Sequence, residues 1–210
     1  MKRTQAKILR EYGPFPGVDN VHGVTFDGQQ VWFATGEQLV ALDPGSGETP
    51  RALNVAASAG TAFDGKYFYQ IADGRIQKVD PKNGRVLSTI PAPGGGGDSG
   101  MAWAEGSLWV GQYQQRKIHQ VDPETGRVLR TIDSDRYVTG VTWVDGQLWH
   151  GTWENDASEL RRLDPATGDV LESVEMPDGV GVSGLESDGA DRFYCGGGNS
   201  GKVRAVRRPG

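Results

Sequence analysis

A four-residue pattern recurs five times along the chain, at spacings of 37, 40, 40 and 44 residues. Each copy opens with glycine, followed by two small or apolar residues and an aromatic residue, and only the fifth copy is degenerate. The copies are Gly23-Val24-Thr25-Phe26, Gly60-Thr61-Ala62-Phe63, Gly100-Met101-Ala102-Trp103, Gly140-Val141-Thr142-Trp143 and Gly184-Leu185-Glu186-Ser187. Self-similarity at about 40 residues is typical of propeller blades and other repeat architectures. This period constrains the fold more than any other feature.

Each unit continues in the same way after its first residues. An Asp-Gly or Glu-Gly turn comes first, which is a strong hairpin signal because glycine adopts a positive φ without steric cost. A strand with an aromatic residue in a fixed column follows, and a third strand ends in an Asp-Pro-x-x-Gly turn. The aromatic column holds Trp32, Tyr69, Trp109, Trp149 and Tyr194, and the third strands end in turns that begin at Asp43, Asp80, Asp122 and Asp164.

Four short strands per unit predict an all-β fold, a five-bladed β-propeller with four antiparallel strands in each blade. Only 26 residues follow Gly184, so the fifth unit lacks its fourth strand. Residues 6–12 resemble the fourth strand at residues 126–132, and we expect this N-terminal strand to complete the last blade and close the ring. The whole chain, residues 1–210, is then one domain.

Composition excludes several classes of protein. The 32 glycines and 11 prolines are explained by turns, and no apolar stretch approaches the ~20 residues of a membrane span. The net charge of −5 argues against nucleic-acid binding, and with Cys195 as the only cysteine there is no internal disulfide. We expect a monomer that does not bind membranes. As the chain stands it would be cytoplasmic, or periplasmic or secreted where a signal peptide has been removed.

The loops divide between two faces of the predicted ring. The Asp-Gly and Asp-Pro-x-x-Gly turns share one regular face, whereas the loops that precede each glycine anchor share the other, variable face, where repeat scaffolds carry their sites. The residues just before the anchors should ring the channel mouth: His22, Ala59, Ser99, Thr139 and Ser183. Around them we expect Asp98, Gln112, Tyr113, Trp153 and Glu186. Such a mouth suits a small polar molecule or a peptide end.

Trp153 is the one tryptophan outside the repeated columns. It either stacks on a ligand or closes the interface between blades. His22 is read as a hydrogen-bonded channel histidine, with a catalytic role as the alternative. The basic residues near the two chain ends, four in residues 1–10 and four in 201–210, are interpreted as a solvated outer strand, and the run Gly94 to Gly97 as a flexible connection.

No cofactor is expected. A three-histidine metal site would need His22, His119 and His150 to converge, but the repeat spreads them around the ring. Asp133-Ser134-Asp135 and Glu154-Asn155-Asp156 offer oxygens of the kind Ca²⁺ binds, but neither matches an EF-hand loop. There is no Gly-x-Ser-x-Gly elbow, and Cys195 is read as an inert thiol.

The blades resemble those of streptogramin-lyase-type propellers, and the five-blade chain as a whole resembles the plant- and bacterial-type glutaminyl-peptide cyclotransferases. Tyr69-Gln70-Ile71 is similar to that family's Tyr-Gln-Val strand, and the stretch from Asp145 to Trp153 resembles its Asn-Gly-x-Val-Trp…Trp segment. The resemblance places Trp153 at a site tryptophan of the family. It also implies departures: His22, Ala59 and Thr139 stand where the family has glutamine, glutamate and asparagine.

Two functions from different classes follow. The first is a binding propeller that accepts a small polar molecule or a peptide N-terminus at the channel mouth. The alternative is an enzyme of the glutaminyl cyclase type with a rearranged site. Cyclisation of an N-terminal glutamine needs a group that takes a proton from the amine and returns one to the leaving ammonia, and Glu186 is the candidate carboxylate for that role.

Overall fold

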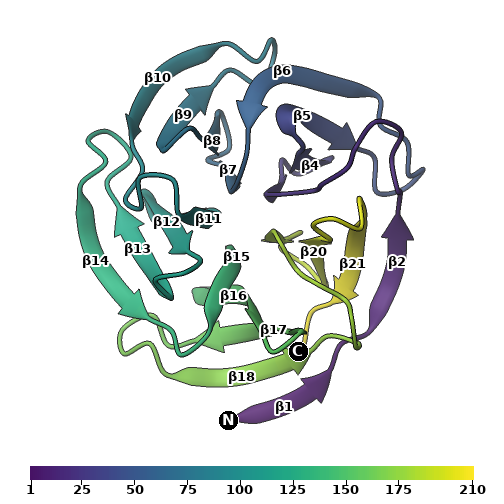
Figure 1. Cartoon of the computed structure of the whole chain (residues 1–210), viewed down its shortest axis with the longest axis vertical. Helices are drawn as coiled ribbons and strands as arrows, with labels where there is room; N and C mark the ends of the chain where they lie inside the picture. Colours follow the sequence, from purple (N-terminus) through teal and green to yellow (C-terminus); the bar gives the residue numbers. More distant parts are fainter.

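The computed structural model describes residues 1–210 and contains five sheets arranged in a ring and no helix (Figure 1). The prediction of a five-bladed propeller is therefore confirmed. The first three blades are formed by β3 (Val24–Phe26), β4 (Val31–Ala34), β5 (Gly36–Leu42) and β6 (Arg51–Ala57); by β7 (Thr61–Phe63), β8 (Phe68–Ala72), β9 (Arg75–Val79) and β10 (Val86–Pro91); and by β11 (Asp98–Ala104), β12 (Ser107–Gln112), β13 (Lys117–Val121) and β14 (Val128–Asp133).

The fourth and fifth blades both include strands from the start of the chain. They are formed by β15 (Tyr137–Val144), β16 (Gln147–Glu154), β17 (Ala157–Leu163), β18 (Val170–Glu175) and β1 (Lys2–Gln5); and by β19 (Leu185–Ser187), β20 (Arg192–Gly196), β21 (Val203–Arg207) and β2 (Ile8–Tyr12). No helix long and apolar enough to cross a membrane is present.

The N-terminal strand β2 closes the ring, as predicted. It pairs antiparallel with β21, and its last residue, Tyr12, is buried among residues of the first and fifth blades. The strand β1 was not predicted. It adds a fifth, parallel strand to the outer edge of the fourth blade, where Lys2 lies 3.0 Å from the buried carboxylate of Glu172. The segment from residue 2 to residue 12 therefore spans two neighbouring blades.

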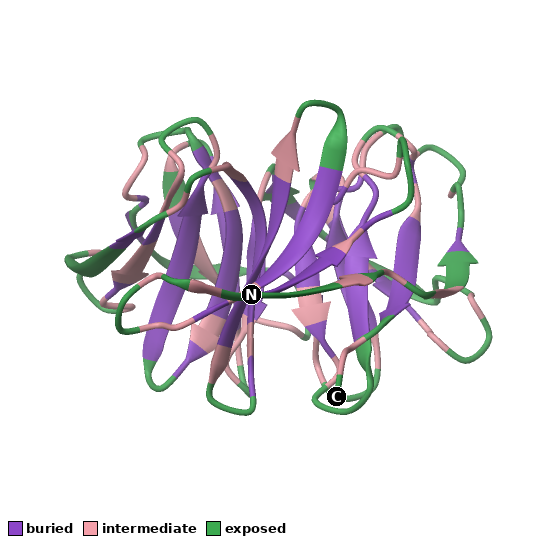
Figure 2. Ribbon diagram, turned by 90° about the horizontal axis from the view of Figure 1, so that it is seen from below, coloured by how far each residue is buried: buried purple, intermediate pink, exposed green.

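The hydrophobic core consists of five separate clusters, one at each junction between blades. Figure 2 shows the buried residues along the body of the blades and the exposed residues in the turns at both ends. The aromatic column of the repeat supplies one large side chain to each cluster: Tyr69, Trp149, Tyr194, Trp32 and Trp109. The fixed aromatic residue of each repeat is thus the residue that fills the space toward a neighbouring blade.

The five anchor glycines meet around the central axis. A Cβ atom on Gly23 would lie 2.4 Å from the carbonyl oxygen of Ala59 in the next blade, and one on Gly184 would lie 2.6 Å from the carbonyl oxygen of His22. Cβ atoms on Gly60, Gly100 and Gly140 would also lie between 2.4 and 2.6 Å from backbone atoms of the following blade. We call these five residues the glycine ring. Glycine is required there because the innermost strands pack backbone against backbone.

The repeated aspartates stabilise the turns of the regular face. In the Asp-Pro-x-x-Gly turn, Asp43 Oδ1 accepts hydrogen bonds from the backbone N–H of Gly45 and Ser46, while Gly47 closes the turn with a φ of +83°. The Asp122 and Asp164 copies form both bonds, and the Asp80 copy forms the first of them. Aspartate is favoured in such turns because its side chain satisfies the N–H groups that the turn leaves free.

Candidate functional site

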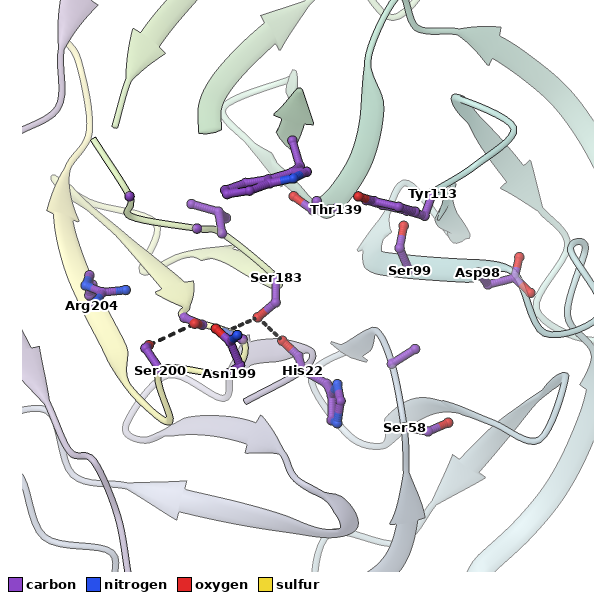
Figure 3. A pocket seen from close by; sticks show the side chains of 17 residues that line it. His22, Ser58, Asp98, Ser99, Tyr113, Thr139, Ser183, Asn199, Ser200 and Arg204 are labelled. Atoms are coloured by element: carbon purple, nitrogen blue, oxygen red, sulfur yellow. Dashed lines mark hydrogen bonds between the residues drawn. The ribbon is translucent and has the colours of Figure 1, made fainter. Parts of the chain in front are cut away.

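A cavity of about 460 Å³ opens at the channel mouth on the variable face (Figure 3). We call it the mouth pocket. The five residues that precede the glycine ring, one from each blade, all line it: His22, Ala59, Ser99, Thr139 and Ser183. Because the next residue in each strand is fixed in the glycine ring, these five side chains are held at the edge of the channel. This is the placement expected from the spacing of the repeats.

Two of these hydroxyl groups link neighbouring blades. Ser99 Oγ donates a hydrogen bond to the carbonyl oxygen of Val138 at 2.7 Å. Ser183 Oγ lies 2.5 Å from the carbonyl oxygen of Val21 and accepts a bond from the N–H of Gly198 at 3.1 Å. These two side chains therefore hold the loops of the mouth in place.

Thr139 differs from both serines. Its Oγ1 is buried and has no hydrogen-bond partner in the protein. The hydroxyl packs over Gly151, where a Cβ atom would come within 2.5 Å of it, so the glycine makes the position possible. A buried hydroxyl without a partner is unusual in a folded protein.

Aromatic side chains form one wall of the mouth pocket. Tyr113 and Trp153 both line it. Tyr113 stacks on Tyr137 with a distance of 4.8 Å between ring centroids, and Tyr137 is the cross-strand partner of Trp153. Trp153 also lies against Gly181, whose Cβ would be 3.5 Å from the indole ring. Trp153 thus packs on the loop between the fourth and fifth blades and also lines the pocket, and ligand stacking stays a prediction.

The charged and titratable groups of the pocket differ in their environments. Burial lowers the pKa of the His22 imidazole, so it is neutral near pH 7. Burial raises the pKa of Asp98, although the backbone N–H of Gly94 donates to its Oδ1 at 2.9 Å. Figure 3 shows the carboxylate of Asp98 turned away from the centre of the pocket. The N–H of Gly94, at the start of the glycine run, therefore holds the Asp98 carboxylate away from the centre of the pocket, and a role of Asp98 in ligand binding stays a prediction.

Two expected mouth residues do not line the pocket. Gln112 is buried, and its Oε1 lies 2.7 Å from His119 Nε2. Glu186 lies two residues beyond Gly184, inside the channel, because the innermost strands run away from the mouth. Its placement at the mouth is therefore wrong.

Within the channel, the carboxyl group of Glu186 lies between two other blades. Thr25 Oγ1 donates to it at 2.9 Å and Thr142 Oγ1 at 2.5 Å, and the N–H of Ser187 donates at 2.9 Å. Protein surrounds the carboxyl group, although part of the residue still faces the channel. Burial raises its pKa to about 7, and the three donors only partly offset this effect.

The acidic loops have partners of their own. Asp135 Oδ1 lies 2.5 Å from Arg161, and Glu154 lies 3.2 Å from Arg116. His150 is fully buried on the face of its strand opposite Trp149, and burial lowers its pKa to about 4. No group of three or more His, Cys, Asp or Glu side chains is placed to hold a metal ion. Burial raises the pKa of the Cys195 thiol to about 12, in keeping with the inert role expected of it.

For the side of the pocket formed by the fifth blade, sequence reasoning predicted Ser183 and missed the rest. Asn199, Ser200 and Arg204 line it, together with the loop before Gly184. The spacing of 44 residues before Gly184, the longest in the chain, was the available signal for that loop. The interpretation of the C-terminal basic residues as a solvated outer strand is wrong for Arg204, which is only 7% exposed because β2 covers β21.

Known proteins provide an independent comparison. The family described as "Outer membrane protein assembly factor BamB" matches residues 72–210. A search of curated proteins finds no match. Among solved structures, glutaminyl cyclase from Myxococcus xanthus is similar with a TM-score of 0.79 and 19% identity, over 98% of this chain and 97% of that chain.

Two further structures share parts of the architecture. Hydrazine synthase from Kuenenia stuttgartiensis has a TM-score of 0.52 and 18% identity, over 85% of this chain and 55% of that chain. A chain of a mitotic checkpoint complex has a TM-score of 0.58 and 12% identity, over 100% of this chain and 94% of that chain. At these identities the similarity shows the fold alone. The resemblance to glutaminyl cyclases expected from the sequence is confirmed at that level.

Proposed function

The chain belongs to the propeller-repeat family described as outer membrane protein assembly factor BamB, and from this membership and the mouth pocket we propose that it is a binding module for a small polar molecule or a peptide end. One observation carries the proposal: one residue from each of the five blades lines a single cavity of about 460 Å³. Ligand pockets commonly measure about 300–1,000 Å³. A family named for an assembly factor also favours binding over catalysis.

The chemistry of the pocket supports this function. Trp153 and Tyr113 offer apolar ring surface, whereas Asn199, Ser200 and Arg204 bring polar groups to the same cavity. A pocket with an apolar wall and a few convergent polar groups is the usual form of a small-molecule site.

Intrinsic fluorescence tests the proposal with two matched variants. Trp153→Phe removes the indole from the pocket, and Trp143→Phe makes the same change beside Trp109, outside the pocket. Dipeptides with either end capped are titrated into each protein. We expect saturable binding that weakens roughly tenfold in the Trp153 variant only, as loss of an aromatic anchor would produce. Saturable binding that both variants leave unchanged would place the ligand elsewhere.

A glutaminyl cyclase activity is the second candidate, favoured by the similarity to the Myxococcus xanthus enzyme over nearly the whole chain. In the mouth pocket, the neutral imidazole of His22 is the group best suited to accept a proton from a substrate amine. Glu186 lies beyond the glycine ring, on the channel side. Mass spectrometry of a glutamine-initiated peptide tests the candidate. A cyclase would release ammonia from this peptide faster than the spontaneous rate, and the His22→Ala variant would react more slowly.

A further inference from the structure

Arg204 is the one lysine or arginine that lines the mouth pocket. It stands on β21, and its side chain is only 9% exposed. Figure 3 shows it on the same side of the pocket as Asn199 and Ser200. A buried guanidinium requires compensation, because removing its charge from water carries a large free-energy penalty.

The protein provides a hydrogen-bond acceptor for only one of the three nitrogen atoms of this guanidinium. Its Nε donates to Glu11 Oε2 at 2.7 Å, while neither Nη group has an acceptor in the protein. Gly197 makes room for the free part, because a Cβ on Gly197 would lie 2.8 Å from Arg204 Nη1. Arg204 lines the pocket, so its guanidinium brings two Nη donor groups there that no acceptor of the protein binds.

The local charges do not balance. Glu11 is shared between Arg204 and Lys202, whose Nζ lies 3.5 Å from the same carboxylate. Two cations and one anion leave one positive charge at this side of the pocket. Asp98, the acidic residue among those that line the pocket, turns its carboxylate to Gly94 instead. A monoanion would complete the site.

We propose that the ligand of the mouth pocket is a small organic carboxylate, whose carboxylate group binds the Nη groups of Arg204. This inference rests on the binding function proposed above. The planar guanidinium fork matches the two oxygens of a carboxylate. One net positive charge suits a monoanion better than a phosphate dianion. It also disfavours a cationic peptide N-terminus, so the site selects the acid end of a ligand over the amine end.

Four probes separate the alternatives by calorimetric titration. N-acetylalanine carries a carboxylate and no amine, and its amide carries neither charge. An acetylated tetrapeptide with a free C-terminus presents the same carboxylate on a longer chain, which distinguishes a peptide end from a free small acid. Alanine amide carries only the amine. We expect N-acetylalanine to bind and its amide to bind at least about tenfold more weakly, the effect of losing a charge-assisted hydrogen bond.

Three variants locate the binding. Arg204→Gln should weaken N-acetylalanine binding at least about tenfold. Lys202→Gln makes the same change of charge outside the pocket lining and should weaken it far less. Glu11→Gln keeps Arg204 and removes its competing carboxylate, so N-acetylalanine should bind more tightly. Glu11→Gln therefore keeps the proposal testable even if Arg204→Gln fails to fold.

The outcomes separate the two proposals. Binding of alanine amide in preference to N-acetylalanine, or equal binding of N-acetylalanine and its amide, would overturn the carboxylate inference and leave the binding function intact. Weaker N-acetylalanine binding in Glu11→Gln would also overturn it. If none of the probes binds the wild-type protein, both proposals fail for ligands of this class.

Discussion

Replacement of Glu186 by glutamine should stabilise the protein at alkaline pH and leave it nearly unchanged in acid. In the folded chain the carboxyl group lies in the channel between Thr25 and Thr142, where burial raises its pKa from the usual 4.5 to about 7. Glutamine has nearly the same size and can hydrogen-bond to the same hydroxyls, but it never ionises. The variant therefore isolates the cost of the buried charge.

The magnitude follows from proton linkage. A pKa raised from 4.5 to about 7 in the folded state corresponds to a free-energy difference of about 3 kcal/mol. Below pH 4.5 the carboxyl is protonated in both folded and unfolded chains, so ionisation has no effect on stability. Between pH 4.5 and 7 the unfolded chain ionises first, and the wild-type protein loses stability as the pH rises. Above pH 7 the full difference of about 3 kcal/mol is lost.

Urea unfolding of both proteins at pH 4.5 and pH 8 provides the assay. We expect the stability difference between Glu186→Gln and wild type to increase by about 3 kcal/mol in favour of the variant from the lower to the higher pH. Glu37→Gln, which removes an exposed glutamate, serves as the control and should show little change. A difference that stays constant between the two pH values would refute the reasoning, because the carboxyl would then ionise equally well in both states.

Three further outcomes can be measured. Gly100→Ala places a Cβ 2.6 Å from the backbone of the next blade, and urea titration should show a free energy of unfolding lower by roughly 1–3 kcal/mol or more. Gly97→Ala is the control and should have little effect, because the nearest atom to its Cβ lies at 3.8 Å. Deletion of residues 1–12 removes both β1 and β2 and should lower the melting temperature by about 10 °C or more. Deletion of residues 1–5 alone should lower it less, and an equal decrease in the two variants would contradict the role of β2 in ring closure. Burial lowers the pKa of His150 to about 4, so the stability that depends on its neutral form should be lost as the pH falls from 6.5 to 4. Unfolding curves should show that stability depends less on acid pH in His150→Gln than in the wild type, and an equal dependence would contradict this role of His150.

The repeated positions were predictable because each has a local physical role that recurs in every blade. Gly23 and its four equivalents fill positions where no Cβ fits, and Asp43 and its equivalents satisfy the N–H groups of a turn. From the glycine register alone, the mouth positions of His22 and Thr139 also followed.

Most features of the fold and the site that the sequence did not predict depend on contacts that occur once in the molecule. The strand β1 has only four residues and pairs with β18 far along the chain, so the repeat pattern does not predict it. The burial of Arg204 depends on Glu11, which is distant in the sequence and reaches it only after the ring closes. Glu186, by contrast, was misplaced although the repeat already gives the direction of its strand, since two residues beyond the glycine ring lie inside the channel.

The glycine ring makes the five blade junctions equivalent, including the one between the fifth and first blades, where Gly184 meets His22 as Gly23 meets Ala59. The ring therefore does not require the chain to begin in one particular blade, and the ends could lie in another blade of the same ring. The backbone N–H of Arg207 donates to the carbonyl oxygen of Lys7 at 2.9 Å, so a short turn could replace the gap between β21 and β2. A circular permutant with that turn, and with new ends in an Asp-Gly turn such as Asp64-Gly65, where the glycine is exposed, is expected to form the same ring.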